Sequence, residues 1–181
     1  AAISGLELGG GKAVIIGDAT KHKTKNLMKK FGKFVDTLSG KYITAEDVGM
    51  STKDMEYVRM ETKHVTGIPK SMGGSGDPSP VTAYGVYMGI KASSKFLWGD
   101  DNLKDKKILV QGIGHVGEFL VKYLSDEKAN VFISDINQTK LDNVASKYGA
   151  TIIDNDSVFD FDMDIYAPCA LGGILNTSNI N

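Results

Sequence analysis

The residues best suited to chemistry in this chain form a glycine-rich run that is followed by an acidic residue. The run has the pattern GxGxxG and consists, in order, of Gly112, Ile113, Gly114, His115, Val116 and Gly117. It follows one predicted strand and opens a predicted helix, and Asp135 ends the next predicted strand, 18 residues after Gly117. This full context is typical of a site that binds a dinucleotide.

Each member of the pattern has its own physical role in such a site. Gly112 would allow the tight turn, Gly114 would let the backbone approach a pyrophosphate at the helix N-terminus, and Gly117 would permit close packing of helix and strand. The Asp135 carboxylate would accept hydrogen bonds from the adenosine ribose and repel a 2′-phosphate, which favours NAD over NADP. The alternative is three turn glycines and a surface aspartate.

A second glycine cluster, Gly9–Lys12, precedes a predicted strand. It is not a phosphate-binding P-loop, because Ala13 and Leu6 stand where that motif needs a hydroxyl residue and a glycine. A lysine half-buried against three glycines would lie where a substrate can approach the backbone, and it could stabilise charge or exchange protons there. A plain surface lysine is an equal alternative for Lys12.

Asp47 is the other candidate acid–base residue. It follows a predicted strand at 42–45, so its carboxylate could lie at the carboxyl end of that strand. It also stands two residues before Gly49, where a simple turn aspartate is equally expected. The residues alone leave both interpretations open.

The elements that must position these residues alternate between strands and helices. Residues 12–17 predict a buried strand, and apolar residues at helical spacing predict a helix over 27–38 that is capped by Thr24 and ended by Gly40. Ser51 and Asp54 form the capping pair of a further helix, and residues 81–98 predict a long, largely buried helix that begins at Ser79 and Pro80. Strands at 108–111, 131–134, 151–153 and 165–167 then alternate with single helices, which predicts a doubly wound parallel sheet.

Composition excludes several other classes of function. With 21 basic and 22 acidic residues the formal charge is −1, which gives no electrostatic reason to expect a nucleic acid or a membrane as partner. No apolar run is long enough to span a bilayer, and the N-terminal residues lack the pattern of a signal peptide. The single cysteine, Cys169, excludes an internal disulfide and makes the cytoplasm the expected compartment. The three histidines lack metal-ligand spacing, so no metal site is expected.

Five segments together resemble a known family, the amino-acid dehydrogenases that act on glutamate, leucine, phenylalanine or valine, and within it most of all the leucine dehydrogenases. They are GLELGGGKAVIIGD, KYITAEDVG, GSGDPSPVTAYGVY, VQGIGHVG and DIYAPCALGG. The resemblance implies reversible oxidative deamination of an L-amino acid to its 2-oxo acid and ammonia, with reduction of NAD. It also implies a homo-oligomer.

The resemblance carries roles onto particular residues. Lys12 matches the catalytic lysine, which polarises the substrate and helps water to attack the imine. Asp47 matches the aspartate that carries protons to and from the amine. Gly9 and Gly10 would form part of the substrate pocket, and Ala45 matches a position where relatives that act on aromatic substrates tend to have glycine.

The remaining implied contacts concern the cofactor and the length of the chain. Thr82 and the loop Ala167–Ala170, with Cys169 and Ala170, would contact the nicotinamide end of NAD. Members of the family extend beyond both ends of this sequence, so we expect a fragment: a partial α/β catalytic domain at 1–72 and an incomplete Rossmann-type NAD-binding domain at 73–181, joined by a loop rich in glycine and proline.

Branched-chain amino acids are the expected substrates. A phenylalanine- or glutamate-type dehydrogenase, or a non-catalytic NAD-binding fragment, are the alternatives.

Overall fold

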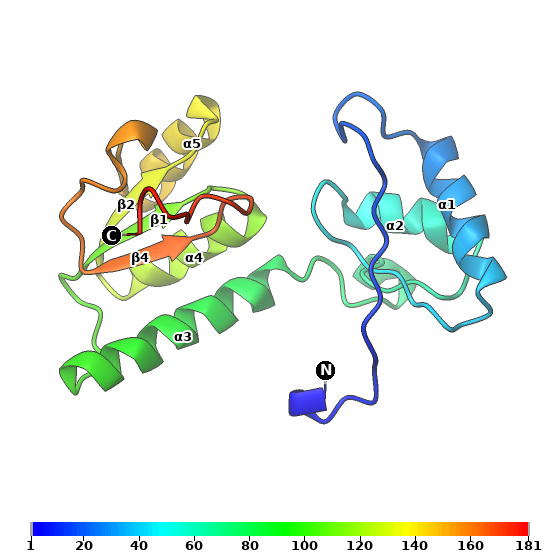
Figure 1. Ribbon diagram of the computed structural model, residues 1–181, viewed down its shortest axis with the longest axis horizontal. Helices are drawn as coiled ribbons and strands as arrows, with labels where there is room; N and C mark the ends of the chain where they lie inside the picture. Colours follow the sequence, from blue (N-terminus) through cyan, green and yellow to red (C-terminus); the bar gives the residue numbers. More distant parts are fainter. Residues whose placement is uncertain (1, 181) are drawn as a thin grey trace. The chain divides into compact units, whose positions relative to one another are not determined.

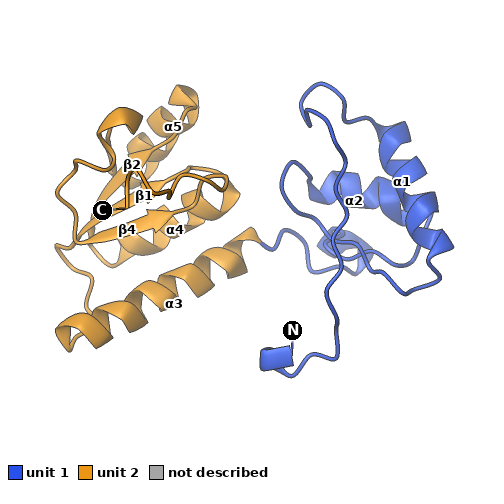
Figure 2. Cartoon of the chain, viewed as in Figure 1, with its two compact units in different colours: residues 1–78 blue, residues 79–181 orange. Residues whose placement is uncertain are grey.

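The computed structural model describes residues 2–180, and these residues form two compact units, which are coloured separately in Figure 2. Among the described residues, unit 1 comprises those up to 78 and unit 2 comprises those from 79 onward. Each unit is built around its own hydrophobic cluster. Within the described residues, no helix combines the length and the apolar character that crossing a membrane requires.

Unit 1 is held together by two helices, α1 (Lys25–Thr37) and α2 (Thr52–Arg59), which pack against each other (Figure 1). Gly32 in α1 permits their close approach, because a Cβ at this position would lie only 2.7 Å from the carbonyl oxygen of Val58. The cluster between the helices is built on four buried side chains: Met28, Met55, Val58 and Val65. Two short 3-10 helices, η1 (Ala2–Ser4) and η2 (Lys70–Met72), complete the unit.

Both helices of unit 1 begin where the sequence predicted. The Thr24 side chain accepts a hydrogen bond from the backbone N–H of Leu27 at 3.2 Å and caps α1. Ser51 and Asp54 form a complete capping box at the start of α2, in which each side chain accepts from the other residue's backbone N–H. These caps satisfy backbone donors that the first turn of a helix leaves without partners.

The two strands predicted for unit 1 are not formed. Residues 12–17 run as coil (the blue segment in Figure 1), and Val14 and Ile16 are 78% and 99% exposed, so the predicted buried strand is wrong. Residues 42–45 contribute a single parallel bridge, from Thr44 to Val65. A strand needs a neighbour for its backbone N–H and C=O groups, and no strand among residues 2–78 provides one.

Unit 2 contains a four-stranded parallel sheet in the order β3-β2-β1-β4. Its strands are β1 (Lys107–Gln111), β2 (Asn130–Ser134), β3 (Thr151–Ile152) and β4 (Ile165–Pro168). In register, Ile108 of β1 stands opposite Val131 of β2 and Ile165 of β4. From β1 the chain adds β2 and then β3 on one side, and it then returns to add β4 on the other side of β1. The order of the strands therefore reverses between β1 and β4. In doubly wound sheets this switch point is where ligands bind.

Helices connect the strands, as the alternation predicted. β1 leads into α4 (His115–Asp126), β2 leads into α5 (Gln138–Tyr148), and a 3-10 helix, η3 (Asn155–Ser157), follows β3. The core of the unit contains side chains from β1, β2 and α4, including Ile108, Val110, Leu120, Leu124 and Ile133, all of which are fully buried. The α/β fold class with a parallel Rossmann-type sheet is therefore confirmed.

The helix α3 (Ser79–Trp98) has the predicted extent but not the predicted burial. It packs along α4, and only Ser79, Ala83, Ile90 and Ser94 are buried. Its other faces are exposed and carry large apolar side chains, including Val81, Phe96 and Leu97. The sequence shows that such residues recur along a helix, but it does not show which neighbours are present to cover them.

Candidate functional site

The glycine-rich turn of unit 2 joins β1 to α4 at the switch point of the sheet. Gly112 has a φ of +95°, and a Cβ there would lie 2.4 Å from the backbone nitrogen of Ala170. A Cβ at Gly117 would lie 2.0 Å from the carbonyl oxygen of Gly112. Both positions therefore exclude any side chain.

Gly114 differs from these two glycines because a Cβ built on it meets nothing within 4 Å. It is the N-cap of α4, so the free backbone N–H groups of the first turn follow directly after it. His115 is exposed, whereas the side chains of Ile113 and Val116 pack in or against the core and leave only their backbone groups available to a ligand. Open space beside a helix N-terminus is what a pyrophosphate requires, so the residues present fit this group.

Asp135 lies directly after β2 and turns its carboxylate toward the glycine-rich turn. Its Oδ2 accepts from the backbone N–H of Ile113 at 2.6 Å, and its Oδ1 accepts from the backbone N–H of Asn137 at 2.8 Å. The structure thus brings together the glycine run and the acidic residue that the sequence pattern paired. Their role toward a ribose stays a prediction.

Two residues that the sequence did not reveal hold Asp135 in place. The side-chain amide of Asn155 donates to the carbonyl oxygen of Asp135 at 2.9 Å, and the fully buried hydroxyl of Ser134 donates to Asn155 Oδ1 at 2.6 Å. Asn155 lies in η3, 20 residues after Asp135. No local sequence signal marks such a pair, since the contact depends on how β2 and η3 lie in the fold.

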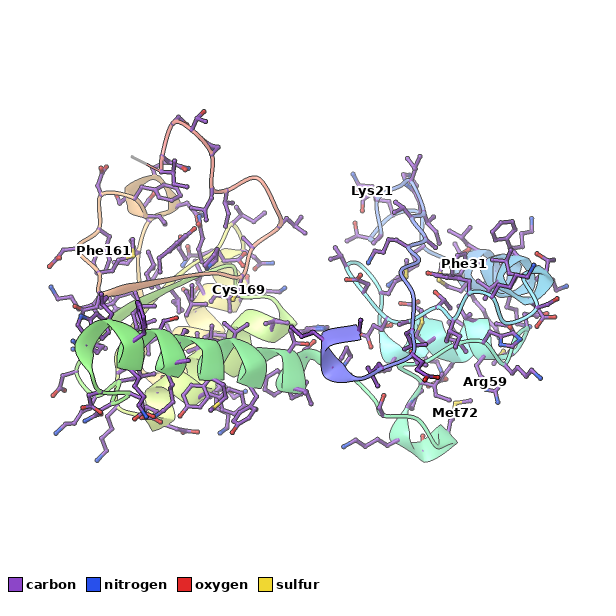
Figure 3. All side chains as sticks on the ribbon, turned by 60° about the horizontal axis from the view of Figure 1, so that its bottom comes forward. Lys21, Phe31, Arg59, Met72, Phe161 and Cys169 are labelled. Carbon is purple, nitrogen blue, oxygen red and sulfur yellow. The ribbon has the colours of Figure 1, made fainter. Side chains whose placement is uncertain are left out.

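The segment after β4 forms the other wall of the turn. The backbone N–H of Cys169 donates to the carbonyl oxygen of Gln111 at 2.7 Å, which brings Ala170 against Gly112. Cys169 is labelled in Figure 3 beside the strand that it follows. Burial raises the pKa of the Cys169 thiol, which favours its protonated, less reactive form. Thr82, the remaining predicted cofactor contact, is exposed in the first turn of α3.

Unit 1 contains a cavity of about 460 Å³ that both predicted acid–base residues line. The Lys12 ammonium and the Asp47 carboxylate form an ion pair there. Their side chains are 66% and 54% exposed, so of the two interpretations left open for Lys12 the structure has the surface lysine and not the half-buried one. The pair comes from two segments that are far apart in the sequence. The residue patterns around Lys12 and Asp47 did not indicate that they meet, whereas the family resemblance, which gives both a role at the same substrate, implied it.

Most of the cavity wall is apolar. Ala45, the predicted substrate-pocket residue, lines it together with Leu27, Met28, Phe31 and Met55 from the two helices. Figure 3 labels Phe31 on α1. Gly9 and Gly10 lie outside this lining and are exposed, with open space at the position of a Cβ. The structure therefore does not bring these two glycines to the cavity.

Asp18, His22 and Lys23 add polar groups to the lining of the cavity. The Lys23 ammonium lies 2.7 Å from Oδ2 of Asp54, which is buried, and both residues belong to segments next to the Asp47 turn. Burial alone would raise the pKa of Asp54, but hydrogen bonds from Lys23 and Ser51 outweigh it and hold this pKa below its ordinary value. Hydrogen bonds from the Thr20 side chain and backbone lower the pKa of Asp18. The backbone N–H of Asp18 donates to Nδ1 of His22 at 3.0 Å.

The strand order and the glycine-rich turn after the first strand define unit 2 as a Rossmann-type fold. Two family models of one dehydrogenase family then match most of the chain. The one described as Glu/Leu/Phe/Val dehydrogenase, dimerisation domain, matches residues 1–64, and the one described as Glutamate/Leucine/Phenylalanine/Valine dehydrogenase matches residues 73–140. The chain belongs to this dehydrogenase family.

Individual relatives agree with this assignment. A leucine dehydrogenase of Thermoactinomyces intermedius is 48% identical over 179 residues, which are 99% of this chain and 49% of the relative. A valine dehydrogenase of Streptomyces virginiae is 42% identical over 182 residues, or 51% of its length. The crystal structure of L-tryptophan dehydrogenase from Nostoc punctiforme matches with a TM-score of 0.70 at 38% identity, over 99% of this chain and 50% of that one. The chain spans about half the length of the curated relatives it matches.

Proposed function

We propose that this chain is part of an NAD-dependent L-amino-acid dehydrogenase that acts on the branched-chain amino acids leucine, valine and isoleucine. The observation that carries the proposal is the Lys12–Asp47 ion pair in the wall of an apolar cavity. The reaction converts the amino acid, NAD⁺ and water into the 2-oxo acid, ammonium, NADH and a proton. Similarity to leucine, valine and tryptophan dehydrogenases supports this class of reaction.

The two charged residues of unit 1 have complementary roles in the proposed chemistry. The Asp47 carboxylate takes a proton from the substrate ammonium group, so that the nitrogen lone pair can assist the loss of hydride from Cα. The Lys12 ammonium polarises the substrate and directs water to the carbon of the resulting imine. As the C–N bond breaks, Asp47 returns its proton to the departing amine. No covalent bond to the protein is needed, so positioning and charge carry the catalysis.

Unit 2 would hold the cofactor. When bound, NAD supplies the acceptor for the hydride that leaves the substrate Cα. The backbone N–H groups that follow Gly114 would bind the pyrophosphate, and Asp135 would accept from the ribose hydroxyls. Asp135 already accepts from the N–H of Ile113, so its carboxylate is held at the turn where the ribose is expected.

The lining of the cavity favours an aliphatic substrate side chain. Leu27, Phe31 and Met55 offer apolar surface, and burial of a leucine side chain there would contribute about 2 kcal/mol. The two lysines of the lining are each paired with an aspartate, which disfavours the side-chain carboxylate of glutamate. The methyl group of Ala45 takes space that glycine would leave to an aromatic ring. An aromatic substrate is the second candidate, because the matched tryptophan dehydrogenase is similar over almost the whole chain.

A substrate panel tests the proposal. The complete protein of which this chain is a part is purified and mixed with NAD⁺ and separately with L-leucine, L-valine, L-isoleucine, L-phenylalanine, L-tryptophan and L-glutamate, and NADH absorbance is followed. We expect reduction with the three aliphatic substrates and a kcat/KM at least about tenfold lower with the others, since a few atoms of misfit cost 1–3 kcal/mol. A preference for tryptophan or phenylalanine would establish the second candidate. If NAD⁺ is bound but none of the six substrates reduces it, the enzyme proposal is wrong, and the protein is a non-catalytic NAD-binding module.

We further propose that the protein forms a homo-oligomer. The family model that matches residues 1–64 is described as a dimerisation domain. Sedimentation equilibrium of the purified protein would show a mass that is a multiple of the single chain, and a monomer at micromolar concentration would contradict the proposal.

A further inference from the structure

The turn that carries Asp47 is largely exposed, so few packing contacts hold it and its backbone hydrogen bonds matter for its position. The backbone N–H of Met50 donates to the carbonyl oxygen of Asp47 at 2.9 Å, and the N–H of Val48 donates to Asp47 Oδ1 at 2.8 Å. Gly49 has a φ of +77°. These contacts shape the turn internally, but they do not anchor it to the rest of unit 1.

Lys23 provides the anchor. Its Nζ donates to the carbonyl oxygen of Gly49 at 2.8 Å and to Oδ2 of Asp54 at 2.7 Å. The Lys23 side chain is only 24% exposed and that of Asp54 only 9%, so water competes weakly for these contacts. A single ammonium group thereby joins the segment before α1, the Asp47 turn and the first turn of α2.

The far end of this link is itself rigid. Oδ2 of Asp54 also accepts from the backbone N–H of Ser51 at 2.8 Å and from the Ser51 hydroxyl at 2.7 Å. Asp54 is the N3 residue of the capping box, so its carboxylate is fixed to the start of α2. Lys23 therefore ties the Gly49 carbonyl to the capped N-terminus of α2.

The same segments meet a second time. A Cβ on Gly49 would lie 3.0 Å from Cβ of Ala19, so the turn packs closely against the segment that leads into Lys23. Residues from both segments, Asp18 and His22 on one side and Asp47 and Met50 on the other, line the cavity. We therefore expect a change in the Lys23 contact to alter the part of the wall that holds the acid–base pair.

We propose that Lys23, together with Asp54, is the positioning residue for Asp47: it holds the turn so that the Asp47 carboxylate meets both Lys12 and the substrate amine. This inference rests on the proposed function for its effect on turnover, although its effect on the turn is independent of that function. Because reacting groups that are misplaced by about 1 Å lose rate on the order of 100-fold, release of the turn lowers kcat. It leaves the KM for NAD unchanged, since no cofactor residue belongs to this network.

The test uses the purified protein and three single variants. Lys23→Met removes the ammonium and keeps the length of the side chain, Lys23→Arg restores a cation, and Lys53→Met removes the exposed Lys53–Glu56 ion pair of α2 as a matched control. Two quantities are measured: kcat and KM for the amino acid and for NAD, and hydrogen exchange of the backbone amides of residues 46–51.

We expect Lys23→Met to lower kcat by at least about tenfold with the KM for NAD within twofold, and to speed exchange over residues 46–51. Lys23→Arg restores most of the kcat and most of the protection from exchange, and Lys53→Met changes neither quantity. Since Lys23→Met leaves Asp54 buried without its cation, it could prevent folding; the double variant Lys23→Met/Asp54→Asn removes that charge, keeps an acceptor for Ser51 and still releases Gly49. We expect this double variant to show the same lower kcat and the same faster exchange over residues 46–51.

Three results would overturn the inference: unchanged kcat, unchanged exchange over residues 46–51, or an equal loss in Lys53→Met. If the parent protein oxidises no amino acid, the proposed function fails instead. The exchange measurement then decides alone whether Lys23 holds the turn.

Discussion

The glycine-rich turn of unit 2 makes a sharp prediction, because two of its glycines have opposite surroundings. A Cβ at Gly117 would lie 2.0 Å from the carbonyl oxygen of Gly112, whereas a Cβ at Gly114 meets nothing within 4 Å. Gly112 cannot move aside easily, since its own α-carbon already faces the backbone of Ala170. Gly117→Ala must therefore distort the turn, while Gly114→Ala leaves it intact.

The size of the effect follows from two opposing contributions. Forcing a methyl group against backbone costs about 3 kcal/mol at the upper end of overpacking effects. Alanine is about 1 kcal/mol better than glycine inside a helix, and Gly117 is the third residue of α4. The free energy of unfolding of Gly117→Ala should thus fall by about 2 kcal/mol. For Gly114→Ala at the N-cap we expect a loss below about 1 kcal/mol.

Urea unfolding measures both values. The chain has one tryptophan, Trp98, at the end of α3 in unit 2, so its fluorescence reports on the unit that is changed. With equal slopes, the shift of the midpoint gives the difference in stability. Binding of NAD should weaken about tenfold in Gly114→Ala, because the added methyl group points into the open space where the pyrophosphate is proposed to bind. A Gly117→Ala protein as stable as the parent, or a Gly114→Ala protein destabilised to the same extent, would refute the reasoning.

Four further predictions concern single side chains. Lys12→Met should reduce turnover by at least about 100-fold while the Kd for NAD, measured by calorimetry, changes less than threefold; a loss of NAD binding would remove the assigned role. Asp135→Ala should raise the KM for NAD, and an unchanged value would count against the ribose contact. Because the pKa of Asp54 is lowered in the folded state, its contribution to stability is complete above its ordinary pKa and is lost as pH falls through the lowered value. The Asp54→Asn protein should therefore be less stable than the parent at pH 7, and its free energy of unfolding should fall less steeply below about pH 4. An equally steep fall in both proteins would contradict this. The half-buried Cys169 thiol, with its raised pKa, should react with iodoacetamide at pH 7 more slowly than free cysteine does, and equal rates would contradict this.

Features that depend on a few neighbouring residues could be predicted from the sequence. The Ser51–Asp54 capping box, the Thr24 cap and the turn at Gly112 all involve contacts within five positions or a fixed strand-to-helix connection. Alternation of apolar strands with single helices was also sufficient for the parallel sheet of unit 2, because such connections have few topological solutions. Asp135 could be placed near the turn for the same reason.

Features that depend on distant partners could not be predicted. Residues 12–17 have the composition of a buried strand, yet the described part of unit 1 offers no strand for them to pair with, and Ile16 is almost fully exposed. The apolar residues of α3 likewise predicted burial, whereas only the face toward α4 is covered. Hydrophobic pattern measures the surface that a segment could bury, and the neighbours present decide how much of it is buried.

The anchoring contact of Lys23 shows why this distinction matters for function. Lys23 stands 31 residues from Asp54 and 26 from Gly49, amid a series of other lysines that the sequence does not distinguish from it. Lys21 and Lys33 also form ion pairs, but their side chains are 75% and 70% exposed, so screening by solvent leaves those pairs little effect. The Lys23 ammonium, in contrast, is fixed in position because it is largely buried against α2. A residue that positions a catalytic group from a distance is thus defined by the environment that the fold builds around it, and its type alone does not reveal it.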